Sequence, residues 1–245
     1  MKRHLVQGAP SGVDQGRREW ITRTGAGAIA ALVGTVLAPS ARAAPRCVAR
    51  PEQTAGPYYV DTRLERSDIR ADPDDGSIKP GVPLQLEFVV SRIDGARCTP
   101  LAGALVDLWQ CDAQGVYSGV RDFAGRFDTR GRQFLRGHQR TDAEGRVRFV
   151  TIYPGAYAGR AVHVHFKVRT DPTAGQGAEF TSQLYFDDAL TDRVHAVPPY
   201  ASDGRRVRND GDVLYRRGGR DLMLQLARDG EGYRGRFELG LRMAG

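Results

Sequence analysis

The sequence predicts an all-β protein, an antiparallel β-sandwich with long loops and few short helices. From Gly81 onward, short apolar runs are separated by Gly, Asp and Pro residues, and several runs alternate apolar with polar side chains. A period of two is the pattern of a strand with one buried face, and a series of short strands bounded by turns is typical of a sandwich. No internal repeat or low-complexity tract interrupts the pattern.

The expected elements begin with a turn-rich segment. Residues 44–75 contain Pro51, Pro57 and Pro73, and we expect this segment to drape over the core. Six strands are expected after it, at Leu84–Ile93, Ala104–Gln110, Arg146–Tyr153, Ala161–Arg169, Phe180–Phe186 and Arg236–Arg242. Two short helices or turns are expected at Asp188–Val194 and Leu222–Ala227.

Two of these strands end in turns that bear on function. Residues 106–111 alternate as a strand does, Asp112–Gly115 has turn composition, and Tyr117 follows that turn. A second turn, Asp142–Gly145, separates two strand-like runs within residues 134–149. We therefore predict a β-hairpin there.

The most informative stretch runs from Thr151 to Phe166. Within it, His163 and His165 flank a single valine, and residues two apart on a strand point to the same face. Their imidazoles would leave the strand close enough together to converge on one metal ion. Tyr157 and Arg160 follow a Pro-Gly turn on the loop that enters this strand. Together these residues indicate a functional site.

Each of these residues also has an ordinary structural explanation. The paired histidines are also what the solvent-exposed face of a half-buried strand would show. Arg160 could likewise be an ordinary surface arginine, because the chain is rich in arginine. Tyr117 is also typical of a strand end, and Tyr153 competes with Tyr157 for any ligand role. Against this, the chain has only five histidines and two of them lie in this one stretch, which favours a functional cluster.

With these motifs, the chain resembles the intradiol ring-cleavage dioxygenases, the family of protocatechuate 3,4-dioxygenase and catechol 1,2-dioxygenase. The resemblance runs from about Thr54 to near Leu241. Its most specific parts are V-D-L-W-Q-C-D-A-Q-G-V-Y, F-L-R-G-H-Q-R-T-D-A-E-G and Y-P-G-A-Y-A-G-R-A-V-H-V-H-F. The resemblance implies a non-haem Fe(III) ion held by two tyrosines and two histidines, which match Tyr117, Tyr157, His163 and His165.

The resemblance also implies roles around the metal. Tyr157 is preferred over Tyr153 because the family places its ligand after the P-G-x step. Arg160 matches the cation at the substrate, and Gln183 matches a glutamine that lies next to the ligands rather than on the metal. His138 and His195 have no neighbours that suggest coordination.

The implied reaction uses O2 to open a catechol ring between its two hydroxylated carbons, giving a muconate-type diacid. Fe(III) is a hard cation, so phenolate oxygens suit it as ligands. The resemblance implies that the substrate displaces Tyr157, which then takes up a substrate proton. Arg160 would stabilise negative charge on the substrate. The alternatives are a non-catalytic β-sandwich binding module and a zinc or copper protein on the same scaffold.

Residues 1–43 have the form of a twin-arginine signal peptide, which leaves residues 44–245 as the catalytic domain. Arg17 and Arg18 precede an apolar run at 25–38, and A-R-A at 41–43 matches a cleavage site. We therefore expect a periplasmic or secreted protein. The apolar run is short for a bilayer and the rest of the chain has no longer one, so no membrane span is expected.

The net charge bears on whether the protein binds nucleic acid, and the cysteine content limits its disulfides. Residues 1–43 carry a net charge of +4, so only +3 of the total of +7 belongs to the rest of the chain. That remainder has no basic patch with interleaved aromatic residues, so no nucleic-acid partner is expected. Cys47, Cys98 and Cys111 allow at most one intramolecular disulfide, and the sequence leaves open whether Cys98 pairs with Cys111.

Substrate choice is expected to lie in two loops, Tyr58–Asp75 and Arg121–Gln133. The second is basic through Arg121, Arg126, Arg130 and Arg132, which would suit a ring carrying a carboxylate. Solvated surface arginines are the favoured explanation of the same residues. The sequence leaves open which catechol is used and whether the chain forms a homo-oligomer, although members of the family commonly associate.

Overall fold

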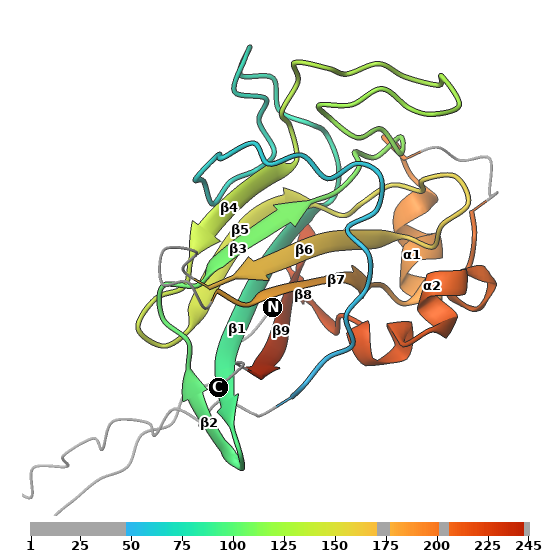
Figure 1. The fold of residues 1–245 in the computed structure, drawn as a ribbon. Coiled ribbons are helices and arrows are strands. Elements are labelled where there is room, and N and C mark those ends of the chain that lie inside the picture. Colours follow the sequence, from blue (N-terminus) through green and yellow to red (C-terminus); the bar gives the residue numbers. More distant parts are fainter. Residues whose placement is uncertain (1–47, 171–176, 201–205, 243–245) are drawn as a thin grey trace, which may run out of the picture. The chain divides into compact units, whose positions relative to one another are not determined.

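Two β-sheets packed face to face make up the part of the chain that the structure, a computed structural model, describes: residues 48–170, 177–200 and 206–242 (Figure 1). The first sheet, sheet A, contains β1 (Pro83–Asp94), β2 (Arg97–Pro100), β5 (Arg146–Ile152), β8 (Leu226–Asp229) and β9 (Gly232–Arg242). The second, sheet B, contains β3 (Leu105–Trp109), β4 (Arg136–Arg140), β6 (His163–Arg169) and β7 (Glu179–Tyr185). The predicted all-β sandwich is confirmed.

The predicted antiparallel direction of the strands fails for one pair, β1 and β9. Sheet B has the order β4-β3-β6-β7, and its three pairings are antiparallel. In sheet A, β1 pairs antiparallel with β2 and β5 but parallel with β9, which in turn pairs antiparallel with β8. The sandwich is therefore mixed at the contact between β1 and β9.

The predicted hairpin around Asp142–Gly145 is wrong. The turn itself forms, and the Asp142 carboxylate accepts a hydrogen bond from the Arg146 backbone N–H at 2.7 Å. However, β4 before the turn pairs with β3 in sheet B, whereas β5 after it pairs with β1 in sheet A. Turn composition reports the local bend only, and here the bend carries the chain from one sheet to the other.

The C-terminal elements also differ from expectation. Of residues 222–227, expected as a helix or turn, Leu222 ends a 3₁₀ turn at Gly219–Leu222, residues 223–225 lie in no helix or strand, and residues 226 and 227 begin β8. The terminal strand, β9, begins at Gly232, four residues before its predicted start. Strands β2 and β8 were not expected, because each has only four residues, most of them exposed.

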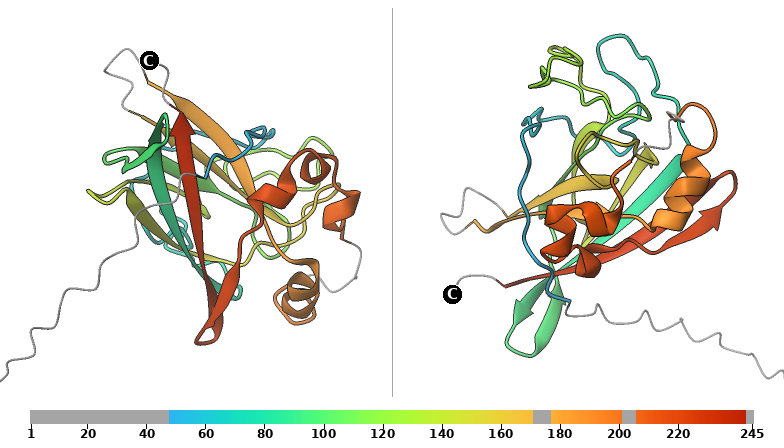
Figure 2. Two further views of the ribbon diagram at one scale, coloured as in Figure 1. Left: turned by 90° about the horizontal axis from the view of Figure 1, so that it is seen from below. Right: turned by 90° about the vertical axis from the view of Figure 1, so that its right-hand side faces the viewer.

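Two short helices, α1 (Asp188–His195) and α2 (Val213–Arg216), lie beyond the end of β7 (Figures 1 and 2). The first was predicted. Asp187 precedes α1 and its carboxylate accepts a hydrogen bond from the Leu190 N–H at 2.8 Å, as an N-cap residue does.

The core lies between the sheets. Phe88 of β1 and Phe237 of β9 meet Phe166 of β6, with ring centroids 5.2 and 5.5 Å from that of Phe166. All three side chains are buried. Since alternate residues of a strand face opposite ways, burial of Phe166 sends His163 and His165 to the other face of sheet B.

That other face is crossed by the N-terminal segment, drawn in blue in Figure 1. The Gln53 N–H donates to the Thr181 carbonyl on β7, and Glu65 forms a bridge with His138 on β4. The segment that was expected to drape over the core therefore covers the outer side of sheet B between these contacts. The predicted signal peptide and Cys47 lie outside the described residues.

The pairing of Cys98 with Cys111 is excluded. Cys98 is disulfide-bonded, whereas Cys111 is a free and buried thiol whose Sγ lies 3.5 Å from the Gly155 carbonyl oxygen.

Over the described ranges, no helix has the length and apolar character needed to cross a membrane.

Candidate metal centre

The outer face of sheet B gathers the predicted site residues in one register. Trp109 on β3 lies opposite His165 on β6, which lies opposite Gln183 on β7. His163, two residues before His165, lies opposite Tyr185. Three neighbouring strands thus present adjacent side chains on one surface, as their alternation requires.

The two loops that carry Tyr117 and Tyr157 interlock through glycines. Gly115 has a φ of +79°, and a Cβ at that position would overlap the Ala156 carbonyl oxygen. A Cβ on Gly155 would overlap the carbonyl oxygens of Asp112 and Ala113. Only glycine allows this approach of the two backbones, and the approach fixes where the tyrosines leave their loops.

Three donor atoms converge beside β6. His163 Nε2 lies 3.0 Å from His165 Nε2 and 3.2 Å from Tyr117 Oη. Bonds of about 2.0–2.1 Å from histidine or oxygen to a single metal ion place neighbouring ligand atoms about 3 Å apart. The spacing of these three atoms therefore fits ligation of one ion.

The two imidazoles are held in different ways. His163 Nδ1 lies 2.7 Å from the Ala161 carbonyl oxygen, which can only accept, so Nδ1 carries the proton and Nε2 has a free lone pair. The His165 ring stacks on Trp109 with centroids 5.0 Å apart and an angle of 3° between the planes. Its Nδ1 is buried without a hydrogen-bond partner among the described residues.

Burial keeps these donors neutral. Burial, reinforced by the charge of Arg160, lowers the pKa of His163 to about 3. Burial, with His163 next in effect, holds the pKa of His165 well below its usual value. Burial also raises the pKa of the Tyr117 phenol well above 10. Neutral imidazoles are the form that binds metals, and a bound cation would reverse the effect of burial on the phenol.

Tyr157 lies next to this trio, but its hydroxyl points to another partner. Its ring centroid is 5.7 Å from that of Tyr117, and its Oη lies 2.8 Å from Tyr58 Oη. Tyr58 Oη in turn donates to Asp122 at 2.6 Å, and Arg126 forms an ion pair with that carboxylate at 2.8 Å. The structure thus brings three of the four predicted ligands into contact and places the fourth beside them.

The roles of Tyr58 and Asp122 were missed in the sequence. Burial and the hydrogen bond to Asp122 raise the pKa of Tyr58, whereas the hydrogen bonds from Arg126 and Tyr58 lower that of Asp122. Tyr58 lies in the stretch T-A-G-P-Y-Y at residues 54–59, where the resemblance to the family begins, and this position could have indicated its role. Asp122 lies 64 residues away in a loop with no local signal.

Arg160 and Gln183, each predicted separately as a site residue, are in direct contact. Arg160 Nη2 donates to Gln183 Oε1 at 2.6 Å and to Tyr185 Oη at 3.2 Å, and its Nε donates to Asp212 at 2.9 Å. Gln183 Nε2 also donates to the Thr54 carbonyl. The Arg160 guanidinium is therefore fixed at the site by these hydrogen bonds and is not an ordinary solvated surface charge.

The other candidates lie elsewhere. Tyr153 is fully buried and its hydroxyl lies 2.7 Å from Thr191 Oγ1 on α1. His138 is half-buried on β4 opposite Asp107, and His195 donates to the Pro154 carbonyl at 3.0 Å. These contacts are ordinary packing, and they favour Tyr157 over Tyr153 as the tyrosine of the site.

The arginines of residues 121–133 are mostly paired with nearby acids. The ion pairs join Arg126 with Asp122, Arg130 with Asp128, and Arg132 with both Asp72 and Asp75. Arg121 forms a backbone bridge with Asp128. This loop therefore presents little unpaired positive charge, which agrees with the favoured structural explanation.

The residues fit a metal that accepts phenolate ligands. No group of three His, Cys, Asp or Glu side chains able to hold a metal occurs in the described part of the chain. A centre built on His163 and His165 consequently needs the tyrosine oxygens to complete it. A hard trivalent cation matches that donor set, because anionic oxygen ligands suit hard ions.

Comparisons with known proteins agree with this arrangement. Residues 54–202 match a family model described as Dioxygenase. Catechol 1,2-dioxygenase 1 of Acinetobacter lwoffii is 30% identical over 180 residues, which cover 63% of this chain and 52% of that protein. The protocatechuate 3,4-dioxygenase beta chain of Burkholderia cepacia is 37% identical over 120 residues, 45% of this chain and 48% of that one. The chain spans about half the length of these curated relatives.

Solved structures share the fold. An intradiol ring-cleavage dioxygenase from Tetranychus urticae superposes with a TM-score of 0.69 at 29% identity, covering 80% of this chain and 95% of that one. The dioxygenase domain of a dioxygenase carbohydrate-binding protein fusion from Streptomyces sp. SirexAA-E gives a TM-score of 0.57 at 30% identity, with 80% of this chain and 100% of that one covered.

Proposed function

Because the chain belongs to the intradiol ring-cleaving dioxygenases, we propose that it uses O2 to open catechol-type rings between their two hydroxylated carbons. The observation that carries the proposal is the contact among Tyr117, His163 and His165, with Tyr157 and Arg160 beside it. The expected products are muconate-type diacids.

We propose that Tyr117, Tyr157, His163 and His165 hold one Fe(III) ion. Two phenolates offset most of the charge of a trivalent ion, so the buried site is left close to neutral. When bound, the iron supplies a Lewis acid that draws electron density from a chelated catecholate and opens the ring to O2. A protein that contains zinc, or no metal, after growth in iron-replete medium would contradict this proposal.

Tyr157 supplies the base that takes up a substrate proton. The hydrogen bond between Tyr157 Oη and Tyr58 Oη supports this role, because it gives the protonated phenol a partner away from the trio. Tyr58 is fixed in turn by its hydrogen bond to Asp122. A protonated Tyr157 held in this way leaves its place beside Tyr117 free for substrate.

Arg160 supplies the electrostatic stabilisation. Its Nε and Nη2 are occupied by Asp212, Gln183 and Tyr185, whereas its Nη1 has no hydrogen bond to the described residues. A permanently charged group held from one side offers its free N–H groups to negative charge that develops on the substrate.

Substrate identity within the catechols is tested by oxygen uptake across a panel. We expect turnover of catechol itself. Rates of oxygen uptake with protocatechuate, hydroxyquinol and chlorinated catechols, compared with the rate for catechol, would show which of these substrates the enzyme prefers. Since most arginines of residues 121–133 are paired with acids, we expect no strong preference for a ring carboxylate. No oxygen consumption with any catechol by iron-loaded protein would contradict the proposed function.

We further propose that the protein is exported through the twin-arginine pathway and acts in the periplasm or outside the cell. The R-R-E-W-I motif at 17–21 and the apolar run after it support this, as does the disulfide of Cys98, since disulfides persist in oxidising compartments. Changing Arg17 and Arg18 to lysine should retain the protein in the cytoplasm, as fractionation and immunoblotting would show.

A further inference from the structure

One buried carboxylate, that of Asp212, joins two parts of the molecule that are distant in sequence. Its Oδ2 accepts hydrogen bonds from Arg160 Nε at 2.9 Å and from the Ala161 backbone N–H at 2.8 Å. Its Oδ1 accepts from the Leu214 N–H at 2.7 Å and from the Tyr215 N–H at 3.3 Å, which caps α2. The side chain is only 1% exposed.

The residues held by Asp212 are those that orient the centre. Its bond to Nε and the bonds from Nη2 to Gln183 and Tyr185 fix the plane of the Arg160 guanidinium. Ala161, whose N–H donates to Asp212, is also the residue whose carbonyl oxygen accepts a hydrogen bond from the His163 ring. A single carboxylate thus restrains the Arg160 guanidinium and also Ala161, the residue that orients His163, a proposed metal ligand.

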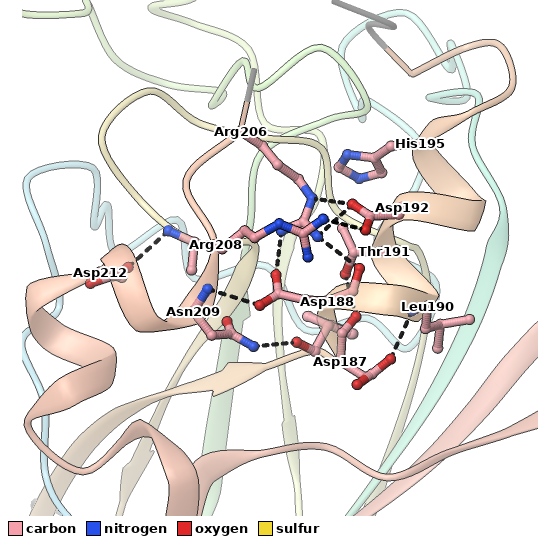
Figure 3. A network of polar contacts seen from close by, with 12 residues as sticks. Asp187, Asp188, Leu190, Thr191, Asp192, His195, Arg206, Arg208, Asn209 and Asp212 are labelled. Atoms are coloured by element: carbon pink, nitrogen blue, oxygen red, sulfur yellow. Dashed lines mark hydrogen bonds and ion pairs between the residues drawn. The ribbon is translucent and has the colours of Figure 1, made fainter. Parts of the chain in front are cut away.

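Asp212 is itself held in place by a second polar network, which Figure 3 shows. Arg206 donates to the Asp188 carbonyl at 2.7 Å and to Asp192 at 2.8 Å. Asn209 donates through its backbone N–H to Asp188 at 3.1 Å and through Nδ2 to the Phe186 carbonyl at 2.8 Å. These bonds hold Arg206 and Asn209 against α1 and against Phe186 just before it, and Asp212 follows Asn209 by three residues.

We propose that Asp212 is a positioning residue that orients Arg160 for catalysis, an inference that rests on the proposed dioxygenase function. Helix capping alone would need only the Oδ1 contacts to α2. The Oδ2 contacts are directed at Arg160 and Ala161 instead. Because the ion pair with Asp212 uses Nε of Arg160, it leaves Nη1 free. The Asp212 carboxylate can therefore orient the Arg160 guanidinium while Nη1 stays available to substrate.

Two matched substitutions separate capping from positioning. Serine is as good an N-cap as aspartate, but its hydroxyl is too short to serve α2 and Arg160 together. Asp212→Ser should therefore keep α2 and lose the hold on Arg160. Asp187→Ser makes the same change at the N-cap of α1, where the carboxylate contacts the Leu190 N–H and not Arg160. Asp212→Asn, which keeps the size and removes the charge, serves as the second variant.

The first readout requires neither metal nor turnover. In ¹⁵N-labelled, metal-free protein, the Arg160 Nε–H signal is identified by its loss in Arg160→Lys. Its exchange with solvent should speed up at least about tenfold in Asp212→Ser and Asp212→Asn, because a buried hydrogen bond to a carboxylate is removed, and should not change in Asp187→Ser. Unchanged exchange in both Asp212 variants would overturn the proposal.

The second readout is a double-mutant cycle on catechol cleavage by iron-loaded protein. Asp212→Ser should lower kcat/KM about tenfold at unchanged iron content, since misplacing a catalytic group slows the reaction. In an Arg160→Ala background, the same change should cost less than about twofold, because the two residues act as one unit. A full tenfold loss in both backgrounds would overturn the proposal. No turnover by the unmodified protein would contradict the proposed function instead, and the exchange comparison would still decide the role of Asp212.

Discussion

At the scale of single residues, the two tyrosines that compete in the sequence are separated by their surroundings. Tyr153 is enclosed in the core and bonded to Thr191, whereas the Tyr157 ring packs against Tyr117 at the centre. The spacing of the two along the chain could not distinguish them. The difference arises because the Pro-Gly turn between them leaves Tyr153 on the core side and carries Tyr157 to the outer face of sheet B.

Conservative substitutions of these tyrosines should therefore have opposite effects. Tyr153→Phe should cost about 1 kcal/mol of unfolding free energy, the worth of one buried hydrogen bond, and leave the visible spectrum of the iron-loaded protein unchanged. Tyr157→Phe should retain iron, shift that spectrum and react slowly, because the proposed base is lost. A normal spectrum and full turnover in Tyr157→Phe would show that the tyrosine of the site is misassigned.

The Tyr58 hydroxyl should affect the reaction through its contact with Tyr157. Tyr58→Phe removes the hydroxyl 2.8 Å from Tyr157 Oη, so the protonated phenol loses its partner. We expect unchanged iron content and a fall in kcat of about tenfold, which is below the roughly 10²–10⁴-fold contributed by groups that transfer the proton themselves. Tyr59→Phe is the matched control, because the Tyr59 ring packs on Trp109. Equal kinetics of the two variants would exclude a role for Tyr58.

The buried histidines should make the metal-free protein sensitive to mild acid. The pKa of His163 in the fold is about 3, against 6.5 ordinarily, so between these values the unfolded chain binds a proton that the fold does not. Stability present above pH 6.5 is therefore lost as the pH falls. The loss should approach about 1.4 kcal/mol per pH unit for each such histidine.

Urea unfolding at pH 7, 6 and 5 measures this effect above the range where the carboxylates titrate. His163→Gln should make the dependence on pH shallower over that interval. An equally steep dependence in the variant would show that His163 is not buried in its neutral form.

At the scale of elements, β6 and its entering loop could be predicted because their information is local. Alternation placed His163 and His165 on one face, and a turn preceded them. Partners that come from far along the chain could not be predicted. Asp212 lies 52 residues from Arg160, and Asp122 lies 64 from Tyr58. The hairpin at 134–149 failed for the same reason, because a turn does not say which sheet its strands join.

The interlocked loops give a test at this scale. Gly155→Ala would drive a methyl group into two carbonyl oxygens, so we expect a loss of about 2 kcal/mol or more and reduced iron content. Gly103→Ala is the control, since this glycine has a φ of +75° but open space around it. That variant should lose only about 1 kcal/mol and keep its iron. Full iron loading in Gly155→Ala would contradict the idea that loop contact places the tyrosines.

At the scale of the whole described chain, the sandwich supplies a rigid surface and the loops supply the chemistry. Sheet B carries the histidines in fixed register, while the two tyrosines, Arg160 and Asp212 come from segments outside the strands. Apolar patterning could predict the sandwich, since strands such as β1, β5 and β9 alternate buried with more exposed residues over part of their length. It could not predict the parallel contact of β1 with β9, because patterning is the same for either direction.

The product formed from catechol tests the central claim most directly. A site that combines tyrosine ligands with Fe(III) should cleave between the hydroxylated carbons and give cis,cis-muconate, which absorbs only in the ultraviolet. Iron-loaded protein should form it with uptake of one O2 per catechol, and Arg160→Ala should form the same product more slowly with its iron in place. A yellow semialdehyde, the product of cleavage beside the hydroxyls, would contradict the proposed mechanism even in a protein that binds iron.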